Sequence, residues 1–254
     1  MTLHVERQGA GEPLLLVHGW GMHGGLWGPA VEQLAMRYTV LRVDLPGHGA
    51  SAPQADYSLD ALVDRLATQF TTPLAVCGWS LGGQVALRWA QRAPEIVRKL
   101  LLVSSTPRFV QAEGWKCAMA PDVLQAFAAS LLENRAQTLK RFLALQVRGS
   151  ENERELLTVL RAQLFSRGEP DAVALRGGLE ILRDSDQRAD LSEVAQPTLV
   201  IAGARDTLTP AAASEYMAAQ MPQARLRVIE GAAHAPFLSH PKIFTDELVK
   251  FLDE

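Results

Sequence analysis

A serine flanked by glycines is the feature of this sequence that most directly suggests chemistry. Ser80 lies in the segment 78–82, GWSLG, which has the spacing Gly-x-Ser-x-Gly. A serine in this pattern sits at the tip of a tight turn between a strand and a helix, and the glycines let the chain double back there. An incidental serine in a glycine-rich turn is the alternative. We favour a nucleophile, because the apolar run Leu74–Cys77 precedes the motif and helix-forming residues follow it.

A serine hydroxyl is a weak nucleophile at neutral pH and requires a general base. Of the six histidines, His234 lies in a loop of small residues, GAAHAPF, just after the apolar run Leu226–Ile229. In triads built on this serine motif the base comes last in chain order. We therefore predict that His234 is the base, whereas His240, beside Pro241, has a structural or surface role.

The base requires a carboxylate to orient it, and that carboxylate should lie between the serine and the histidine in the sequence. Asp206 follows the apolar run Thr198–Ile201 and precedes a helix that is expected to begin near Pro210. This places it at the carboxyl end of a strand, where open α/β sheets gather their active sites. A turn or helix-cap role is the alternative for Asp206. Three other aspartates, in charged and apparently solvated sequence, are weaker candidates: Asp184, Asp186 and Asp190.

The oxyanion of an acyl-transfer reaction needs backbone N–H donors. The residue after the nucleophile, Leu81, supplies one of them, and the loop after an early strand supplies the other. The segment 17–21, VHGWG, fits that loop, and we predict that Trp20 donates its backbone N–H. His18 and His48 are expected to brace loops.

Short apolar runs alternate with longer amphipathic segments, which predicts a mainly parallel sheet with crossover helices. A helix is expected over residues 58–70 and another directly after Ser80. The alternation stops between residues 107 and 186, where the sequence is helical in character. The predicted fold class is therefore α/β, with a core of residues 1–106 and 187–254 and a helical cap of residues 107–186. The runs expected to form strands are Leu14–Val17, Thr39–Val43, Leu74–Cys77, Leu100–Val103, Thr198–Ile201 and Leu226–Ile229.

Composition narrows the function further. The chain has 254 residues, of which 25 are basic and 28 are acidic. Because these charges nearly balance, the protein has no overall positive electrostatic potential to hold a nucleic acid. Cys77 and Cys117 are too few for a disulfide framework, and the scattered histidines predict no metal site. Neither a signal peptide nor a membrane span is indicated. We expect a cytoplasmic, cofactor-free monomer.

Together these motifs resemble the α/β-hydrolase superfamily along essentially the whole chain: HGWG, DLPGHGAS, GWSLGG, ARD and AAHAPF occur in the expected order. Ser80 separates the chain from the branches with an aspartate nucleophile. Within the superfamily, RFLALQ, RGGLEILRDSDQR and AAHAPFLSHP make it similar to the esterases that hydrolyse the methyl ester of pimeloyl-acyl-carrier protein in biotin synthesis.

The resemblance implies a substrate site. In that family the early tryptophan, the serine turn and a cap segment line the site, which corresponds here to Trp20, Leu81 and the segment 142–146. Packing of the cap against the core is the alternative role for the apolar members of that segment. The segment consists of Phe142, Leu143, Ala144, Leu145 and Gln146.

The resemblance also implies a carrier-protein contact through cap arginines, matched here by Arg141 and Arg154. Gln137 and Thr158 stand where further arginines are expected, so the footprint departs from the family pattern. Residues 135–167 nevertheless contain seven basic and three acidic side chains. An acidic carrier would be attracted to such a surface, although ordinary solvated helix charge is the alternative.

The sequence thus predicts a serine carboxylesterase that converts the methyl ester of pimeloyl-acyl-carrier protein to pimeloyl-acyl-carrier protein and methanol. One alternative is a general carboxylesterase for small free esters. Less favoured are a binding protein that keeps the triad without turnover and a hydrolase of carbon–carbon bonds, since the triad does not define the bond cleaved.

Overall fold

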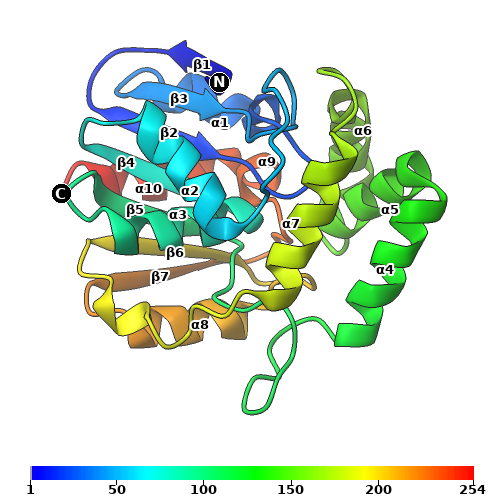
Figure 1. The fold of residues 1–254 in the computed structure, drawn as a ribbon. Helices are drawn as coiled ribbons and strands as arrows, with labels where there is room; N and C mark the ends of the chain where they lie inside the picture. Colours follow the sequence, from blue (N-terminus) through cyan, green and yellow to red (C-terminus); the bar gives the residue numbers. More distant parts are fainter. Residues whose placement is uncertain (1) are drawn as a thin grey trace.

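The computed structural model describes residues 2–254. Within them, seven strands form one sheet in the order β1-β3-β2-β4-β5-β6-β7, with helices on both faces (Figure 1). The strands are β1 (Val5–Gln8), β2 (Pro13–Val17), β3 (Thr39–Val43), β4 (Leu74–Trp79), β5 (Val97–Val103), β6 (Thr198–Gly203) and β7 (Ala224–Ile229).

The sheet is parallel except at one edge, where β1 pairs with β3 in the antiparallel sense. The predicted α/β class and the six predicted strands are confirmed, with small differences at their ends. The apolar runs missed β1. Its sequence, VERQ, carries no apolar run because an edge strand is covered on fewer sides than a central one.

Helices of the core follow the strands. Ser58 caps α2 as the sequence predicts, because its hydroxyl accepts a hydrogen bond from the Ala61 N–H. α2 and α3 pack against each other on one face, whereas α1 and α10 pack together on the other (Figure 1). These elements are η1 (Gly24–Trp27), α1 (Pro29–Leu34), α2 (Leu59–Gln69), α3 (Leu81–Arg92), η2 (Leu191–Glu193), α8 (Ala211–Gln220), α9 (Pro236–Ser239) and α10 (Pro241–Leu252).

Four helices between β5 and β6 gather at one end of the sheet (Figure 1). Asn134 separates the first two of these helices. Its side chain accepts a hydrogen bond from the Gln137 N–H and so caps the start of the second helix. Residues 107–120, which the sequence places in the helical region, form an irregular segment with isolated bridges instead. The helices are α4 (Pro121–Glu133), α5 (Arg135–Val147), α6 (Glu153–Leu164) and α7 (Ala172–Asp184). The limits of a cap domain at 107 and 186 remain a prediction.

The central strands are buried on both sides, which explains their unbroken apolar sequences. Across residues 2–254, none of the helices combines the length and the apolar character that crossing a membrane requires.

Candidate active site

Ser80 occupies a strained turn between β4 and α3. Its backbone has φ 56° and ψ −119°, a conformation that residues with a side chain rarely adopt. The turn is held from the next strand, because the Ser80 N–H donates to the Val103 carbonyl (3.0 Å) and the Ser105 hydroxyl donates to the Ser80 carbonyl (2.8 Å). The hydroxyl of Ser80 therefore projects at the carboxyl end of the sheet beside the first turn of α3.

The glycines around Ser80 are required by close packing. A Cβ atom on Gly78 would overlap the Gly82 carbonyl group, and one on Gly82 would overlap the Val17 carbonyl. Backbone atoms cannot rotate away, so these positions accept no side chain without movement of the chain. The Gly-x-Ser-x-Gly spacing thus has a steric cause in this fold.

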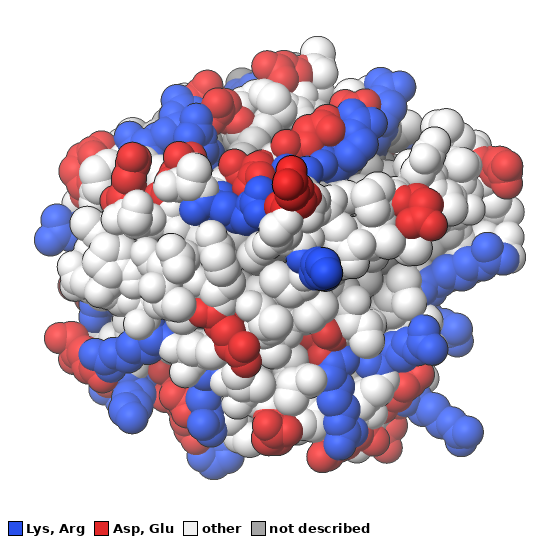
Figure 2. All heavy atoms as spheres, turned by 90° about the horizontal axis from the view of Figure 1, so that it is seen from below, with Lys and Arg blue, Asp and Glu red and all other residues white. Residues whose placement is uncertain are grey.

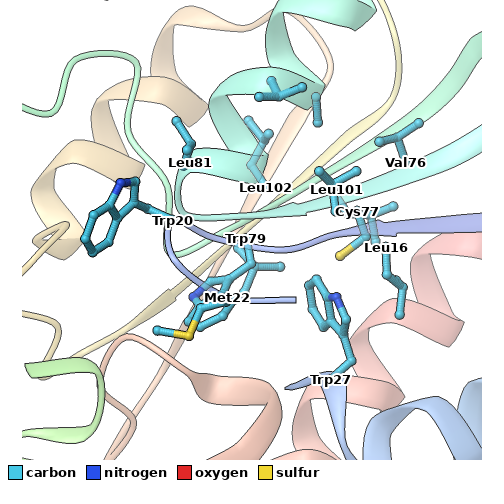
Figure 3. Close-up of a cluster of buried hydrophobic side chains, with 14 of the residues drawn as sticks. Leu16, Trp20, Met22, Trp27, Val76, Cys77, Trp79, Leu81, Leu101 and Leu102 are labelled. Carbon is cyan, nitrogen blue, oxygen red and sulfur yellow. The ribbon is translucent and has the colours of Figure 1, made fainter. Parts of the chain in front are cut away.

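The loop after β2 lies against the serine turn. A Cβ atom on Gly19 would lie 3.2 Å from the Ser80 Cβ, so the loop that leads into Trp20 packs directly on the serine side chain. The Trp20 indole N–H donates to the Leu175 carbonyl of α7 (2.8 Å). Figure 3 shows Trp20, Trp79 and Leu81 within one cluster of buried side chains. Leu81 begins α3, and the N–H groups of the first helical turn have no partners within the helix.

Asp206 and His234 form a buried pair. The distance between His234 Nδ1 and Asp206 Oδ2 is 2.7 Å, and their side chains are 1% and 0% exposed. A carboxylate only accepts hydrogen bonds, so Nδ1 donates and Nε2 of the neutral ring is left as an acceptor. Asp206 is fixed in turn, because its Oδ1 accepts the N–H groups of Leu208 (2.9 Å) and Thr209 (3.0 Å).

Two backbone contacts place the His234 loop beside the serine turn. The indole N–H of Trp79, the residue before Ser80, donates to the His234 carbonyl (2.8 Å). The His234 N–H donates to the Gln146 carbonyl at the end of α5 (3.1 Å). Within the described chain, His234 Nε2 is buried without a hydrogen-bond partner, so no bond to the Ser80 hydroxyl is formed. Such bonds commonly tighten only when substrate binds.

The structure places the other sequence candidates away from this pair. His18 donates from Nδ1 to the Gly19 carbonyl (2.8 Å) and accepts the Leu45 N–H at Nε2 (2.9 Å), which links the loops after β2 and β3. Burial lowers the pKa of His18 to about 3, with the neighbouring His48 adding to the effect. Burial lowers the pKa of His48 to about 4. Both rings are therefore neutral at physiological pH.

Two of the three competing aspartates are engaged elsewhere. Asp184 pairs with Arg183 (2.7 Å), and Asp186 pairs with Arg188 (2.7 Å) and Arg108 (3.0 Å). The hydrogen bond from Arg188 is the main reason that the pKa of Asp186 falls to about 2.

The cap segment 142–146 meets the site through its aromatic and polar members. The rings of Phe142 and Trp20 lie edge to face, with centroids 5.0 Å apart, and Phe127 of α4 completes the cluster at 5.4 Å from Trp20. Leu143 is fully buried, while Ala144 and Leu145 are half-buried. The Gln146 side chain is 1% exposed, and within the described chain neither its Nε2 nor its Oε1 has a partner.

The seven basic residues of the segment 135–167 divide into two groups. Arg135 pairs with Glu169, and Arg167 pairs with Glu6 and Asp44, so these two cations are engaged within the protein. The others are exposed and form no ion pair within residues 2–254. They are Lys140, Arg141, Arg148, Arg154 and Arg161. Arg154 and Arg161 share α6, whereas Arg148 lies just beyond the end of α5 and does not share a helix with Arg141.

Sequence reasoning missed three residues around the site: Ser105, Phe127 and Thr209. Ser105 and Phe127 carry no motif, and their contacts to Ser80 and Trp20 arise from packing. Thr209 follows Asp206 by three residues, a spacing typical of local side-chain to backbone hydrogen bonds, and this signal was available.

Ser80 is only 9% exposed, and His234 is 1% exposed. Both residues are therefore largely shielded from solvent by the surrounding chain. Among residues 2–254, no group of three or more histidine, cysteine, aspartate or glutamate side chains is arranged to hold a metal ion.

A strained serine, a buried histidine–aspartate pair and an α/β sheet that presents them at its carboxyl edge describe a class of hydrolytic protein. Residues 14–247 match the model of the alpha/beta hydrolase family. The chain belongs to the alpha/beta hydrolase family.

The curated relatives narrow the comparison and confirm the resemblance found in the sequence. A pimeloyl-[acyl-carrier protein] methyl ester esterase of Nitrosomonas europaea is 45% identical over 243 residues, which cover 96% of both chains. One of Chromobacterium violaceum is 44% identical and covers 100% of this chain and 99% of its own.

Solved structures share the fold. An esterase from Exiguobacterium antarcticum superposes with a TM-score of 0.91 at 25% identity, covering 99% of this chain and 96% of its own. A bromoperoxidase from Bacillus anthracis, at 21% identity, has a TM-score of 0.90, covers 99% and 95% of the two chains and shows the fold alone.

Proposed function

We propose that this protein hydrolyses the methyl ester of pimeloyl-acyl-carrier protein, releasing methanol and leaving the free carboxylate, as a step of biotin synthesis. The observation that carries the proposal is the full-length similarity, at 38–45% identity, to three esterases of that name. The buried His234–Asp206 pair beside the strained Ser80 supports it with a site suited to ester hydrolysis.

In the proposed mechanism, the Ser80 hydroxyl attacks the ester carbonyl while His234 Nε2 takes its proton. The backbone N–H groups of Leu81 and Trp20 stabilise the oxyanion. Asp206 keeps the protonated imidazole oriented. The intermediate collapses when His234 returns the proton to the leaving methoxide, which departs as methanol. Water, activated by His234, then hydrolyses the acyl-enzyme and restores Ser80.

The cap supplies the proposed substrate site. The edge-to-face aromatic contacts of Trp20 with Phe142 and Phe127 form an apolar wall suited to a methylene chain. Leu143 is fully buried, so its role is packing between cap and core. Gln146 is suited to a polar group of the substrate, because its amide is buried and has no partner within the described chain.

The carrier protein is proposed to dock on the free cations of α5 and α6, including Arg141 and Arg154. Both side chains are exposed and unpaired within residues 2–254, so neither must give up an internal ion pair to bind an acidic partner. The segment 142–146 belongs to α5, which carries Arg141 and packs against α6, which carries Arg154.

The deciding experiment is methanol release from pimeloyl-carrier protein methyl ester by the wild-type protein and by Ser80→Ala, beside a small free methyl ester. We expect efficient release by the wild type and loss of at least a thousandfold in the variant. Cleavage of the small ester alone would instead support a general carboxylesterase. Binding without turnover of any ester would support a non-catalytic protein.

A second experiment tests the docking surface. The double charge reversal Arg141→Glu with Arg154→Glu should raise KM for the carrier substrate about tenfold or more while sparing the small ester. The matched control reverses Arg7 and Arg98, which are exposed, lie outside the cap and change the net charge equally. Equal effects of the two double variants would refute specific docking through the cap.

A further inference from the structure

We propose that Thr209 is a positioning residue for the acid–base pair, because its hydroxyl holds Asp206 Oδ2 in line with His234 Nδ1. This inference rests on the proposed function of the pair. It adds a fourth residue, one that does not touch substrate, to the serine, histidine and aspartate.

The contacts of Thr209 converge on one carboxylate oxygen. Its hydroxyl donates to Asp206 Oδ2 at 2.8 Å and lies 3.3 Å from His234 Nδ1. Asp206 Oδ2 also accepts the His234 Nδ1–H at 2.7 Å. The hydroxyl thus touches both members of the pair, and Thr209 is 1% exposed, so water does not compete for these bonds.

Thr209 also binds the other carboxylate oxygen through its backbone. Its N–H and the Leu208 N–H donate to Asp206 Oδ1. Pro210 follows directly, and a residue before proline is restricted to extended backbone conformations. The backbone of Thr209 therefore has little freedom to move its N–H away from Asp206.

The hydrogen bond from the residue 209 N–H to Asp206 would remain after a substitution that changes only the side chain. The hydrogen bond from the hydroxyl requires threonine or serine at this position. Valine has nearly the same shape but no hydroxyl, and it would leave Asp206 Oδ2 with the imidazole as its sole donor. The carboxylate would then be free to rotate about the Oδ1 contacts. Without the hydroxyl donor, Asp206 Oδ2 would also retain more of its negative charge. A more negative oxygen beside the imidazole favours the protonated ring.

The test compares Thr209→Val with Thr209→Ser, which keeps the hydroxyl. The control is Thr198→Val, which removes another buried hydroxyl, one that donates to the Gln196 carbonyl. For each protein, kcat and KM are measured from pH 5 to pH 9 on a p-nitrophenyl ester as well as on the carrier substrate. If the protein turns over the p-nitrophenyl ester but not the carrier substrate, the proposed function is wrong. The effect of the Thr209 variants can still be measured on the p-nitrophenyl ester.

We expect Thr209→Val to lower kcat roughly tenfold, with KM within about twofold of the wild type. The acidic limb of its profile of kcat/KM against pH should move to higher pH by about half a unit. Thr209→Ser should keep the wild-type profile, and so should Thr198→Val. A wild-type kcat and profile for Thr209→Val would overturn the proposal, as would an equal defect in Thr209→Ser or the same shift in Thr198→Val.

Discussion

At Ser80, a residue with a side chain adopts φ 56°, and such a conformation costs on the order of 1–3 kcal/mol. The neighbouring contacts retain it, since Ser80 is hydrogen-bonded through its N–H to Val103 and through its carbonyl to Ser105. Gly82 lets β2 approach the turn closely. Local strain at one residue is thus sustained by the packing of the adjacent strands.

Gly82→Ala tests the close packing at this turn. The added Cβ would overlap the carbonyl oxygens of Val17 and His18, which belong to the backbone and cannot turn away. We expect a loss of about 3 kcal/mol in the free energy of unfolding, measured by urea denaturation. The control is Gly114→Ala, where a Cβ meets no atom within 4 Å and only the strain of φ 68° remains. That control should cost about 1 kcal/mol, and an equal loss in both variants would contradict the steric explanation.

His48 predicts a pH dependence of stability. Its pKa falls from 6.5 to about 4 on folding, mainly because burial disfavours the charged ring. Below pH 6.5 the unfolded chain therefore binds more protons than the folded protein, so stability declines as pH falls from about 6.5 towards 4 and levels off below that. At pH 5 the contribution of this histidine amounts to about 2 kcal/mol of lost stability.

His48→Phe removes this titration. The free energy of unfolding should fall less between pH 7.5 and pH 5 in this variant than in the wild type, by about 2 kcal/mol. Urea denaturation at the two pH values measures the difference, with His4→Gln as a control near the surface. Parallel declines in the wild type and in His48→Phe would show that His48 does not carry the effect.

Among the elements, the cap helices are attached to the core at several points. The Trp20 indole bonds to α7, and His23 Nε2 lies 2.9 Å from the Gln163 carbonyl in α6. Arg167, between α6 and α7, pairs with the fully buried Asp44 (3.2 Å) and with Glu6 (2.7 Å). These contacts fix one side of the cap to the loops after β2 and β3.

Asp44 is an unusual anchor because burial alone would raise the pKa of its carboxyl. The Ala50 and Gly24 N–H groups and the nearby Arg167 outweigh that effect, and its pKa lies below the usual value. A lowered carboxyl pKa contributes stability that is present above pH 3.8 and is lost as pH falls through the folded-state pKa.

Arg167→Met tests the anchor. Asp44 would keep its two N–H donors but lose its cation, and we expect a loss of about 2 kcal/mol in the free energy of unfolding at pH 7. The loss should shrink towards pH 3 as Asp44 becomes protonated. Arg135→Met is the matched control in the same cap, because its partner Glu169 is exposed; it should change stability by less than about 0.5 kcal/mol. Equal losses, or a loss that does not vary with pH, would contradict the anchor.

For the whole molecule, the formal net charge is −3, yet five cations of the segment 135–167 have no ion-pair partner within residues 2–254. Elsewhere the charges are mixed, and acidic and basic side chains intermingle over the face shown in Figure 2. The proposed docking of an acidic carrier would therefore depend on the free cations of α5 and α6 and not on the overall charge.

Ionic strength provides the measurement at this scale. Raising salt from about 0.05 to 0.5 M shortens the screening length from more than 10 Å to less than 5 Å, and KM for the carrier substrate should rise about tenfold. Turnover of a small neutral ester should hardly change, since it requires no charged docking. A carrier-substrate KM that is independent of salt would contradict electrostatic docking.

Several features were predictable because they are recorded locally in the chain. The unbroken apolar runs predicted six strands, since parallel strands are buried on both faces. Ser80, Asp206 and His234 were selected because each follows such a run, and all strands of a parallel sheet end at the same edge. β1 lacked this signal, because its sequence VERQ contains no apolar run.

Other features were decided only when distant segments packed together. Arg167 contacts Asp44, which lies 123 positions away in the sequence, and Thr209 contacts His234, which lies 25 positions away. The ring of Phe127 packs against that of Trp20. Packing also determined which cap cations are neutralised, since Arg135 and Arg167 find partners and Arg141 and Arg154 do not within residues 2–254. A linear pattern records spacing and burial but not which distant side chains meet. The sequence alone therefore determined six of the seven strands and the chain order of the candidate site residues, whereas the tertiary structure decided what surrounds them.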